Sequence, residues 1–290
     1  MKKIKLYMLP ILFLAFILTA CEDAPPLDYV KKYYLEAYIF VGDPIKNIKV
    51  LATQPLSDSF NYSKSLIKDA NVVIKSGNNT YPLVYDFDKN SGYYYSDTNF
   101  RIKELTEYTI EVTFKDGSSM KGTTNTPQSI VWTKVPTGEL LYYPIDSLKM
   151  PPDTNKLEWK AIPGTLYYIV SLKCLDTLEY GKYLTPVSNE MNRRIVRPWE
   201  SPNSPEYLET TRWGILPTNS SAVLWNAFKW YGKSDLKIYN PDYNFLMYFI
   251  QYQRTGSFDA KLSNIKGDGF GIFASAAYIQ KDFFLIKNQP

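Results

Sequence analysis

The sequence predicts an all-β protein with two antiparallel β-sandwich domains, and three observations lead to this prediction. Apolar and polar residues alternate in short runs along most of the chain, turn residues separate these runs at regular intervals, and helical spacing is almost absent. The 290 residues, of which 45% are hydrophobic, are enough to bury a substantial core.

The N-terminal segment, residues 1–20, has the features of a secretory signal peptide. A short basic start precedes an apolar run over residues 6–20, which is shorter than the roughly 20 apolar residues of a membrane-spanning helix. The acidic residues Glu22 and Asp23 follow, instead of a stop-transfer segment. We therefore expect this segment to be removed.

The tetrapeptide Leu18-Thr19-Ala20-Cys21 resembles the lipobox of bacterial lipoproteins, in which the cysteine thiol is acylated and becomes the mature N-terminus. The alternative is a buried structural cysteine behind an ordinary signal peptide. We expect Cys21 to carry palmitate-type chains that hold the protein on a membrane without spanning it. Residues 21–30 then form a lipidated tether, which two prolines keep extended.

Loss of the signal peptide leaves a nearly neutral chain. Residues 1–20 contain three lysines and no acidic residue, so the mature chain has 30 basic and 29 acidic residues and a net charge of +1. This balance gives no electrostatic reason to expect nucleic acid as a partner.

The first sandwich, of the immunoglobulin or transthyretin type, is expected over residues 31–127. Alternation with period two begins at Tyr33 and ends at the turn Gly42-Asp43-Pro44. Gly77-Asn78-Asn79 and Asp116-Gly117 predict two further turns. The expected strands cover residues 33–41, 46–51, 70–74, 81–87, 93–95, 108–114 and 120–124.

Thr126-Pro127 predicts a domain boundary, and a fibronectin type III-like sandwich is expected over residues 128–290. Its first two strands, residues 157–159 and 167–172, flank a turn, and Trp159 is expected to be buried. Residues from about 180 to 217 hold five prolines and show no sustained period. We interpret them as a Pro-rich insertion that is either a functional loop or disordered.

One short helix is expected at Ser220 to Tyr231, where apolar residues follow helical spacing between a capping Ser221 and a terminating Gly232. Phe245 to Tyr252 is apolar on both faces, as in a strand that is covered on both sides. The other strands expected in this part of the chain cover residues 236–239, 272–278 and 283–286.

Several segments, taken in order, resemble a Bacteroidota family of outer-membrane lipoproteins known as DUF4249, a domain of unknown function. The likeness covers nearly the whole mature chain. Besides the lipobox, it rests on the segments 33–42, 67–72, 92–94, 126–127 and 264–273. Members are commonly encoded beside TonB-dependent receptors of the SusC type, which implies an accessory role in nutrient capture or uptake. No catalytic residues are described for the family.

The absence of histidine excludes Ser-His-Asp and Cys-His nucleophiles and the commonest zinc ligands. With Cys21 lipidated, the remaining thiol is Cys174, which is expected in a strand interior with little access to reactants. We predict a protein that is not an enzyme and has no cofactor. The alternative that stays open is a carboxylate-based hydrolase, with candidate acids Glu158, Glu179, Glu200, Glu206 and Glu209.

Two loops have residues that suggest ion binding. Asp86, Asp88 and Asn90 present alternate oxygen side chains, as a weak calcium site does, but the same residue types form hairpin turns. The glycines of residues 267–271 resemble a phosphate-binding loop, yet no helix start follows them. We expect a turn at the first loop and a bulge or tight bend at the second.

The aromatic content is the compositional feature with functional meaning, since the chain has 25 Tyr, 15 Phe and 6 Trp. Trp199, Tyr207 and Trp213 lie in the Pro-rich insertion, where such large side chains either dock on the sandwich or bind a partner. Their flat apolar faces and polar edges suit protein interfaces or sugar stacking.

We therefore expect a protein that is lipid-anchored to the outer membrane and faces the cell surface, as the acidic residues after Cys21 suggest. It would serve a SusC-type TonB-dependent receptor as a non-enzymatic accessory or capture subunit, with a glycan or peptide as ligand. The alternatives are a stand-alone glycan-binding lipoprotein that uses loop aromatics, and the carboxylate hydrolase.

Overall fold

The computed structural model describes residues 29–55, 57–141, 156–175, 179–191, 195, 211–223, 227–255 and 260–286. The chain divides into two units, one of residues 32–53 and 60–290 and the other of residues 1–31 and 54–59. In the second of these units, the Asp58 amide donates to the Pro55 carbonyl at 3.1 Å and closes a turn. The predicted signal peptide and Cys21 lie outside the described residues.

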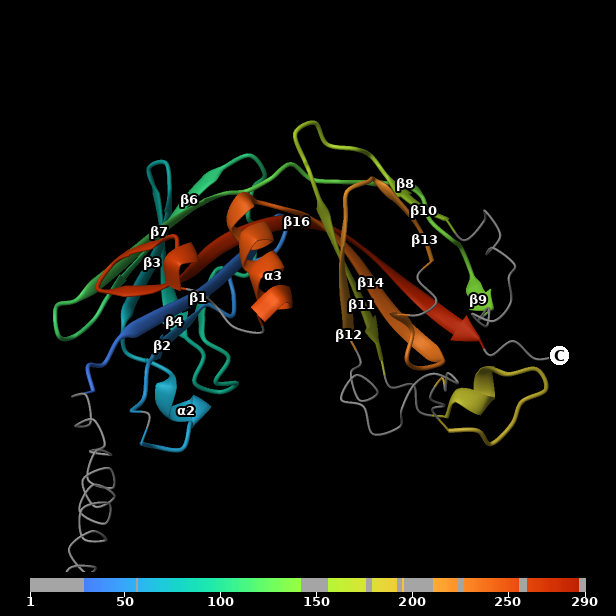
Figure 1. The fold of residues 1–290 in the computed structure, drawn as a ribbon, viewed down its shortest axis with the longest axis horizontal. Coiled ribbons are helices and arrows are strands. Elements are labelled where there is room, and N and C mark those ends of the chain that lie inside the picture. The colour runs from blue at the N-terminus through green and yellow to red at the C-terminus, as the bar shows by residue number, and fades with distance from the viewer. Residues whose placement is uncertain are drawn as a thin grey trace, which may run out of the picture. The chain divides into compact units, whose positions relative to one another are not determined.

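The fold is all-β with few helices, which confirms the predicted class (Figure 1). The largest sheet has seven strands, in the order β12 (Thr211–Leu216), β11 (Tyr168–Cys174), β14 (Gly232–Pro241), β16 (Gly269–Ile286), β1 (Tyr33–Phe40) and β2 (Lys49–Ala52), with β9 (Glu139–Leu141) also paired with β16. A six-stranded sheet has the order β15 (Ile265–Gly267), β7 (Ser119–Asn125), β6 (Glu107–Thr113), β3 (Asn71–Ser76), β4 (Asn79–Tyr85) and β5 (Tyr93–Tyr95).

A three-stranded sheet and four short helical segments complete the described fold. The sheet has the order β13 (Ser220–Ala222), β10 (Lys156–Trp159) and β8 (Trp132–Lys134). The helical segments are α2 (Tyr62–Ser65), α3 (Tyr243–Thr255) and the 3₁₀ helices η2 (Tyr180–Tyr183) and η5 (Ala260–Leu262).

Strand β16 connects the two halves of the fold. Its first half pairs in parallel with β1, and its second half pairs antiparallel with β14. Because side chains alternate along a strand, Phe273, Phe283 and Leu285 share one face. Phe273 lies in a core with the six-stranded sheet, whereas Phe283 and Leu285 lie in a core with the three-stranded sheet. One face of the seven-stranded sheet therefore packs on both smaller sheets.

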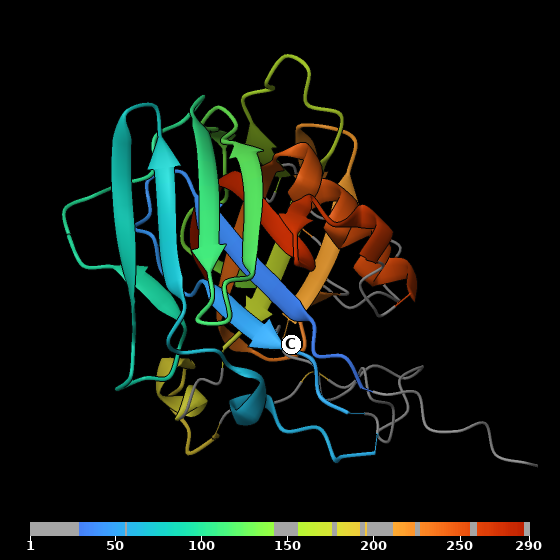
Figure 2. The same cartoon turned by 90° about the vertical axis from the view of Figure 1, so that its left-hand side faces the viewer.

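The first core lies between β1 and the six-stranded sheet, which Figure 2 shows in front of β1. The predicted alternation of β1 is confirmed, since Leu35, Ala37 and Ile39 are buried and the residues between them are partly exposed. Ile265 and Phe273 also belong to this core. It thus takes residues from both sides of Thr126-Pro127, because β15 pairs with β7 and β16 pairs with β1.

The second core surrounds Trp159, which is fully buried as predicted. Its ring meets Tyr168 edge-to-face at 5.3 Å between centroids. Cys174 is also buried, and its sulfur accepts a hydrogen bond from the Lys229 amide at 3.3 Å. This thiol has the protected environment that was predicted for it.

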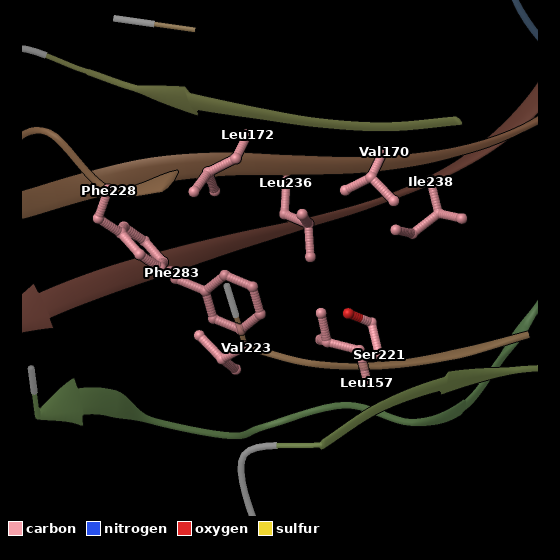
Figure 3. Close-up of a pocket in the computed structure, with 9 residues that line it drawn as sticks. All are labelled: Leu157, Val170, Leu172, Ser221, Val223, Phe228, Leu236, Ile238 and Phe283. Carbon is pink, nitrogen blue, oxygen red and sulfur yellow. The ribbon is translucent and has the colours of Figure 1, made fainter. Parts of the chain in front are cut away.

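A small void remains inside the second core, between the seven-stranded and three-stranded sheets (Figure 3). Its lining is apolar except for Ser221, and includes Leu157, Leu236 and Phe283. The void has about 20 Å³, which is room for one water molecule at most. We interpret it as a packing defect and not as a ligand site, because an apolar lining offers no partners to a water.

The predicted position of the helix is wrong. The strand β13 occupies Ser220–Ala222, and the helix α3 lies at Tyr243–Thr255, where a strand was expected. Phe245 and Phe249, one helical turn apart, are buried on the seven-stranded sheet. Asp242 caps the helix, since its Oδ1 accepts the Phe245 amide at 2.7 Å. Short apolar runs fit a buried helix as well as a strand, and the capping signal at Asp242 was missed.

Two more segments differ from the prediction. Residues 272–278 and 283–286 belong to the single strand β16. Thr211–Leu216, in the predicted Pro-rich insertion, is the strand β12, which pairs with β11 along its whole length. The strand β12 is only six residues long and stands among prolines, so the sequence shows no sustained period there.

The glycine-rich segment forms the tight bend that was predicted. It carries the chain from β15 to β16, with backbone φ angles of 106° at Gly267 and 138° at Gly271. Asp268 fixes the bend, because its Oδ2 accepts the Ser119 amide at 2.8 Å. The bend brings Gly271 opposite Leu35 in the parallel pair of β1 and β16.

Candidate functional site

The face of the seven-stranded sheet that points away from the two cores is partly covered by α3, which contacts β16 and β14 (Figure 1). Under the helix lies a third apolar cluster that includes Ile169, Tyr239, Phe245 and Phe249. Its rings touch edge-on or tilted, as in the pair of Tyr239 and Phe245 with centroids 6.0 Å apart. This cluster fixes α3 on the sheet.

Beyond the cluster, two rows of polar side chains cross the sheet. The strand register places Ser171, Lys237 and Gln280 in one row, with Trp213 at its end on the edge strand β12. The next row contains Lys173, Asp235 and Asp282. Side chains directly opposite on antiparallel strands have Cβ atoms about 4.5–5.5 Å apart, so each row is continuous. We call the polar residues of these rows the polar strip: Ser171, Lys173, Asp235, Lys237, Gln280 and Asp282.

The polar strip holds charges of both signs, with Lys173 directly opposite Asp235 and the two acids Asp235 and Asp282 directly opposite each other. The Nζ of Lys237 lies 3.9 Å from Oδ2 of Asp235, and the Nζ of Lys233 lies 3.9 Å from Oδ2 of Asp282. Lys173, Gln280 and Asp282 are exposed to solvent. The strip is therefore polar and open, with nearly balanced charge.

Asp235 is the least exposed acid of the strip, with 18% of its side-chain surface accessible. Burial raises the pKa of this carboxyl, Lys237 lowers it, and the like charge of Asp282 raises it further. Its Oδ1 atom is buried and accepts no hydrogen bond from the part of the chain that the structure describes. An unpaired buried acceptor is unfavourable, and a ligand on this face meets only the accessible part of the carboxylate.

Trp213 provides an aromatic surface beside the strip. Its ring lies 6.0 Å from Tyr239 at an interplanar angle of 28°, and 5.6 Å from Phe249 of α3. These contacts fix the indole, while 44% of the residue stays exposed. A fixed, accessible aromatic ring next to hydrogen-bonding groups is typical of sites that bind polar ligands with apolar faces.

A second surface feature is a hollow of about 390 Å³ near the start of α3. Large apolar side chains stand at its edge, and Leu105, Leu166 and Tyr243 are 72%, 74% and 74% exposed. Tyr167, also at this edge, is 40% exposed. We call these four residues the apolar rim. Clustered exposed apolar groups usually mark an interaction surface.

Comparison with known families shows that residues 22–281 match the model of the DUF4249 family, which is described as a domain of unknown function. The chain belongs to the DUF4249 family. No curated protein matches this DUF4249 chain. The match confirms the resemblance to the DUF4249 family itself, and it assigns no reaction or ligand.

In this DUF4249 protein the predicted cation ligands are engaged in a turn between β4 and β5. Asp86 accepts the Lys89 amide through Oδ1 at 3.0 Å and the Ser91 hydroxyl through Oδ2 at 2.9 Å. These bonds, the one from the Lys89 amide first, lower the pKa of Asp86. Asn90 accepts the Tyr85 hydroxyl at 2.5 Å. The contacts of Asp86 and Asn90 are those expected of a hairpin turn, and Asp88 lies in the same turn.

Metal-binding clusters are absent from the described ranges, in which no three or more Asp, Glu, Cys or His side chains are placed to hold an ion. Two of the candidate acids of the hydrolase alternative form surface ion pairs, Glu158 with Lys156 at 3.0 Å and Glu179 with Lys182 at 2.5 Å. Glu200, Glu206 and Glu209 lie outside the described residues.

Of the three aromatic residues that were predicted to bind a ligand, Trp213 lies beside the polar strip, and Trp199 and Tyr207 lie outside the described residues. The expectation that Trp213 is in an irregular loop is wrong, because it belongs to β12. The polar strip itself was missed, since its residues come from three distant segments. The signal for it was the polar half of the alternation in residues 171–173 and 235–237.

None of the helices within the described segments is long and apolar enough to cross a membrane.

Proposed function

We propose that this DUF4249 protein is anchored by lipid at Cys21 in the outer membrane, faces the cell surface, and serves a SusC-type TonB-dependent receptor as a non-enzymatic capture subunit. The lipobox supports the anchor, and the near-neutral mature chain gives no electrostatic reason to expect nucleic acid as a partner. Membership of the DUF4249 family supports the accessory role, because the resemblance to this family implied an association with TonB-dependent receptors of the SusC type.

The observation that carries the proposal is the apolar rim. Leu105, Leu166 and Tyr243 come from three separate segments, and each exposes more than two thirds of its surface around one hollow. Contact with a receptor would remove this surface from water, at about 25 cal/mol for each Å² of apolar area. A capture subunit needs such a docking surface in addition to its ligand site.

Leu166→Asp is expected to weaken binding to the receptor at least tenfold. A charge in the middle of a desolvated apolar contact loses its hydration without gaining a partner, whereas in the free protein it stays in water. The measurement is the amount of TonB-dependent receptor that co-purifies with the full lipidated chain in mild detergent.

Phe60→Asp is the matched control, because Phe60 is also 74% exposed but lies before α2, away from the hollow. It should leave the amount of receptor unchanged. If Leu166→Asp and Phe60→Asp co-purify as much receptor as the wild-type protein, the apolar rim is not the docking surface. If wild-type protein brings down no receptor, the accessory role itself is wrong.

The carboxylate hydrolase is the second candidate, because Asp235 and Asp282 are directly opposite in β14 and β16 and burial raises the pKa of Asp235. Such chemistry needs two acids close together, one of which keeps its proton as a general acid. Product release from an oligosaccharide that Asp235→Asn abolishes would favour this candidate over a non-enzymatic role.

A further inference from the structure

The polar strip and Trp213 together have the chemistry of a carbohydrate site. We propose that this face of the seven-stranded sheet binds a neutral oligosaccharide, with one sugar ring packed on Trp213 and the hydroxyls of a neighbouring ring bonded to Asp235, Lys237 and Gln280. The inference rests on the proposed capture role and names the class of ligand that is captured.

The indole of Trp213 is suited to a sugar ring because it is accessible and already fixed. The π face of an aromatic ring is negative, and the C–H groups of a pyranose are weakly positive, so the two surfaces attract as well as exclude water. Tyr239 and Phe249 hold the ring at centroid distances of 6.0 and 5.6 Å, so binding orders little that was mobile.

The polar strip is suited to hydroxyl groups because it offers both donors and acceptors. Lys237 donates only, Gln280 donates and accepts, and Asp235, with 18% of its side-chain surface accessible, accepts only. A hydroxyl can donate to Asp235 and accept from Lys237 at the same time. Neighbouring strands are about 4.8 Å apart, so these groups are spread over the width of one sugar ring.

The charge of the strip favours a neutral ligand. Lys173 and Lys237 are balanced by Asp235 and Asp282, and both lysines stand beside Asp235, Lys173 directly opposite it and Lys237 with its Nζ 3.9 Å from Oδ2. A phosphate or an acidic sugar that approached either lysine would also meet one of the carboxylates. An uncharged polar ligand has no such cost, and it can use every group of the strip.

The test uses the full lipidated chain in detergent micelles and isothermal titration with cellohexaose, xylohexaose, maltohexaose and mannohexaose. At least one of these should bind. Trp213→Ala should weaken that binding at least tenfold and Trp213→Phe less, because phenylalanine keeps an aromatic face. Gln280→Ala should weaken it about threefold, and since Gln280 is exposed, this variant keeps the fold.

Tyr94→Ala is the control, because Tyr94 is 38% exposed on β5 of the six-stranded sheet and should leave saccharide binding unchanged. The proposal is overturned if none of the four saccharides binds, if binding survives Trp213→Ala, or if an uncharged peptide binds at Trp213 in their place.

Receptor co-purification from the same preparations separates the two proposals. If the receptor co-purifies but no saccharide binds, the carbohydrate site is contradicted and the accessory role is supported. If a saccharide binds in a way that requires Trp213 but no receptor co-purifies, the carbohydrate site is supported and the accessory role is contradicted.

Discussion

Gly271→Ala is expected to lower the free energy of unfolding by about 3 to 5 kcal/mol, from backbone strain and overpacking together. A Cβ atom at Gly271 would lie 2.0 Å from the carbonyl oxygen of Leu35 and 2.6 Å from its amide nitrogen. Both atoms belong to the backbone of β1, so no side-chain rotation can relieve the overlap. The φ of 138° is in addition a region that almost only glycine occupies.

The strain is expected to affect the whole fold because β16 belongs to both cores. Moving β1 away from Gly271 breaks the parallel pair, and β16 then loses the register that also places Phe283 and Leu285. Since single domains are stable by only about 5 to 15 kcal/mol, we expect little soluble protein. Urea unfolding of the mature chain, followed by circular dichroism, measures the loss.

Gly117→Ala is the matched control. Gly117 also has a positive φ, of 86°, but no atom lies within 4 Å of where its Cβ would be. Its substitution should cost only the left-handed backbone, about 1 to 2 kcal/mol. Equal losses in the two variants would show that the close approach of β16 to β1 does not determine the stability.

The strands were largely predictable because their signal is local. The alternation of β1 and the turn residues between β3 and β4 are in the sequence itself, and the structure reproduces both. The pairing of β1 with β16 was not predictable from such patterns. It joins residues more than 230 positions apart, and alternation does not tell a strand which partner it will have.

The helix was misplaced for a different reason. Phe245 to Tyr252 is apolar throughout, so periodicity does not distinguish a helix from a strand, and the deciding residue is Asp242 just before it. The candidate site shows the same limit. Trp213 was found from composition, but its neighbours Asp235 and Gln280 are adjacent only through the strand register.

Asp242→Ala is expected to lower the free energy of unfolding by about 2 to 3 kcal/mol, from a lost helix cap and a lost charge-assisted hydrogen bond to a buried hydroxyl. Besides capping α3, the carboxylate accepts the Thr124 hydroxyl of β7 at 2.5 Å through Oδ2. The Asp242 amide donates to the Ser275 carbonyl of β16 at 2.9 Å. Asp242 thus ties the helix to strands of two sheets.

Asn61→Ala provides the comparison, since Asn61 caps the exposed helix α2 by accepting the Lys64 amide at 3.1 Å. This substitution removes a cap without leaving a buried group unpaired and should cost about 1 kcal/mol or less. A similar loss at Asp242 would mean that the bond to Thr124 contributes nothing. Asp242→Asn, which keeps a capping oxygen, should cost less than Asp242→Ala.

The pH dependence of Asp242→Asn is a further test of the buried carboxyl. Burial raises the pKa of Asp242 above its ordinary value of 3.8, although the bonds from Thr124, Phe245 and Ser275 lower it. The folded state therefore holds the proton more tightly than the unfolded state, and the wild-type protein loses stability as pH rises through the folded pKa. The asparagine has no such titration. The difference in the free energy of unfolding between wild-type protein and Asp242→Asn should be largest near pH 4 and decrease toward pH 7. A constant or increasing difference in urea unfolding would contradict the raised pKa.

Because α3 also carries Phe249 against Trp213, loosening this cap should weaken saccharide binding as well as the fold.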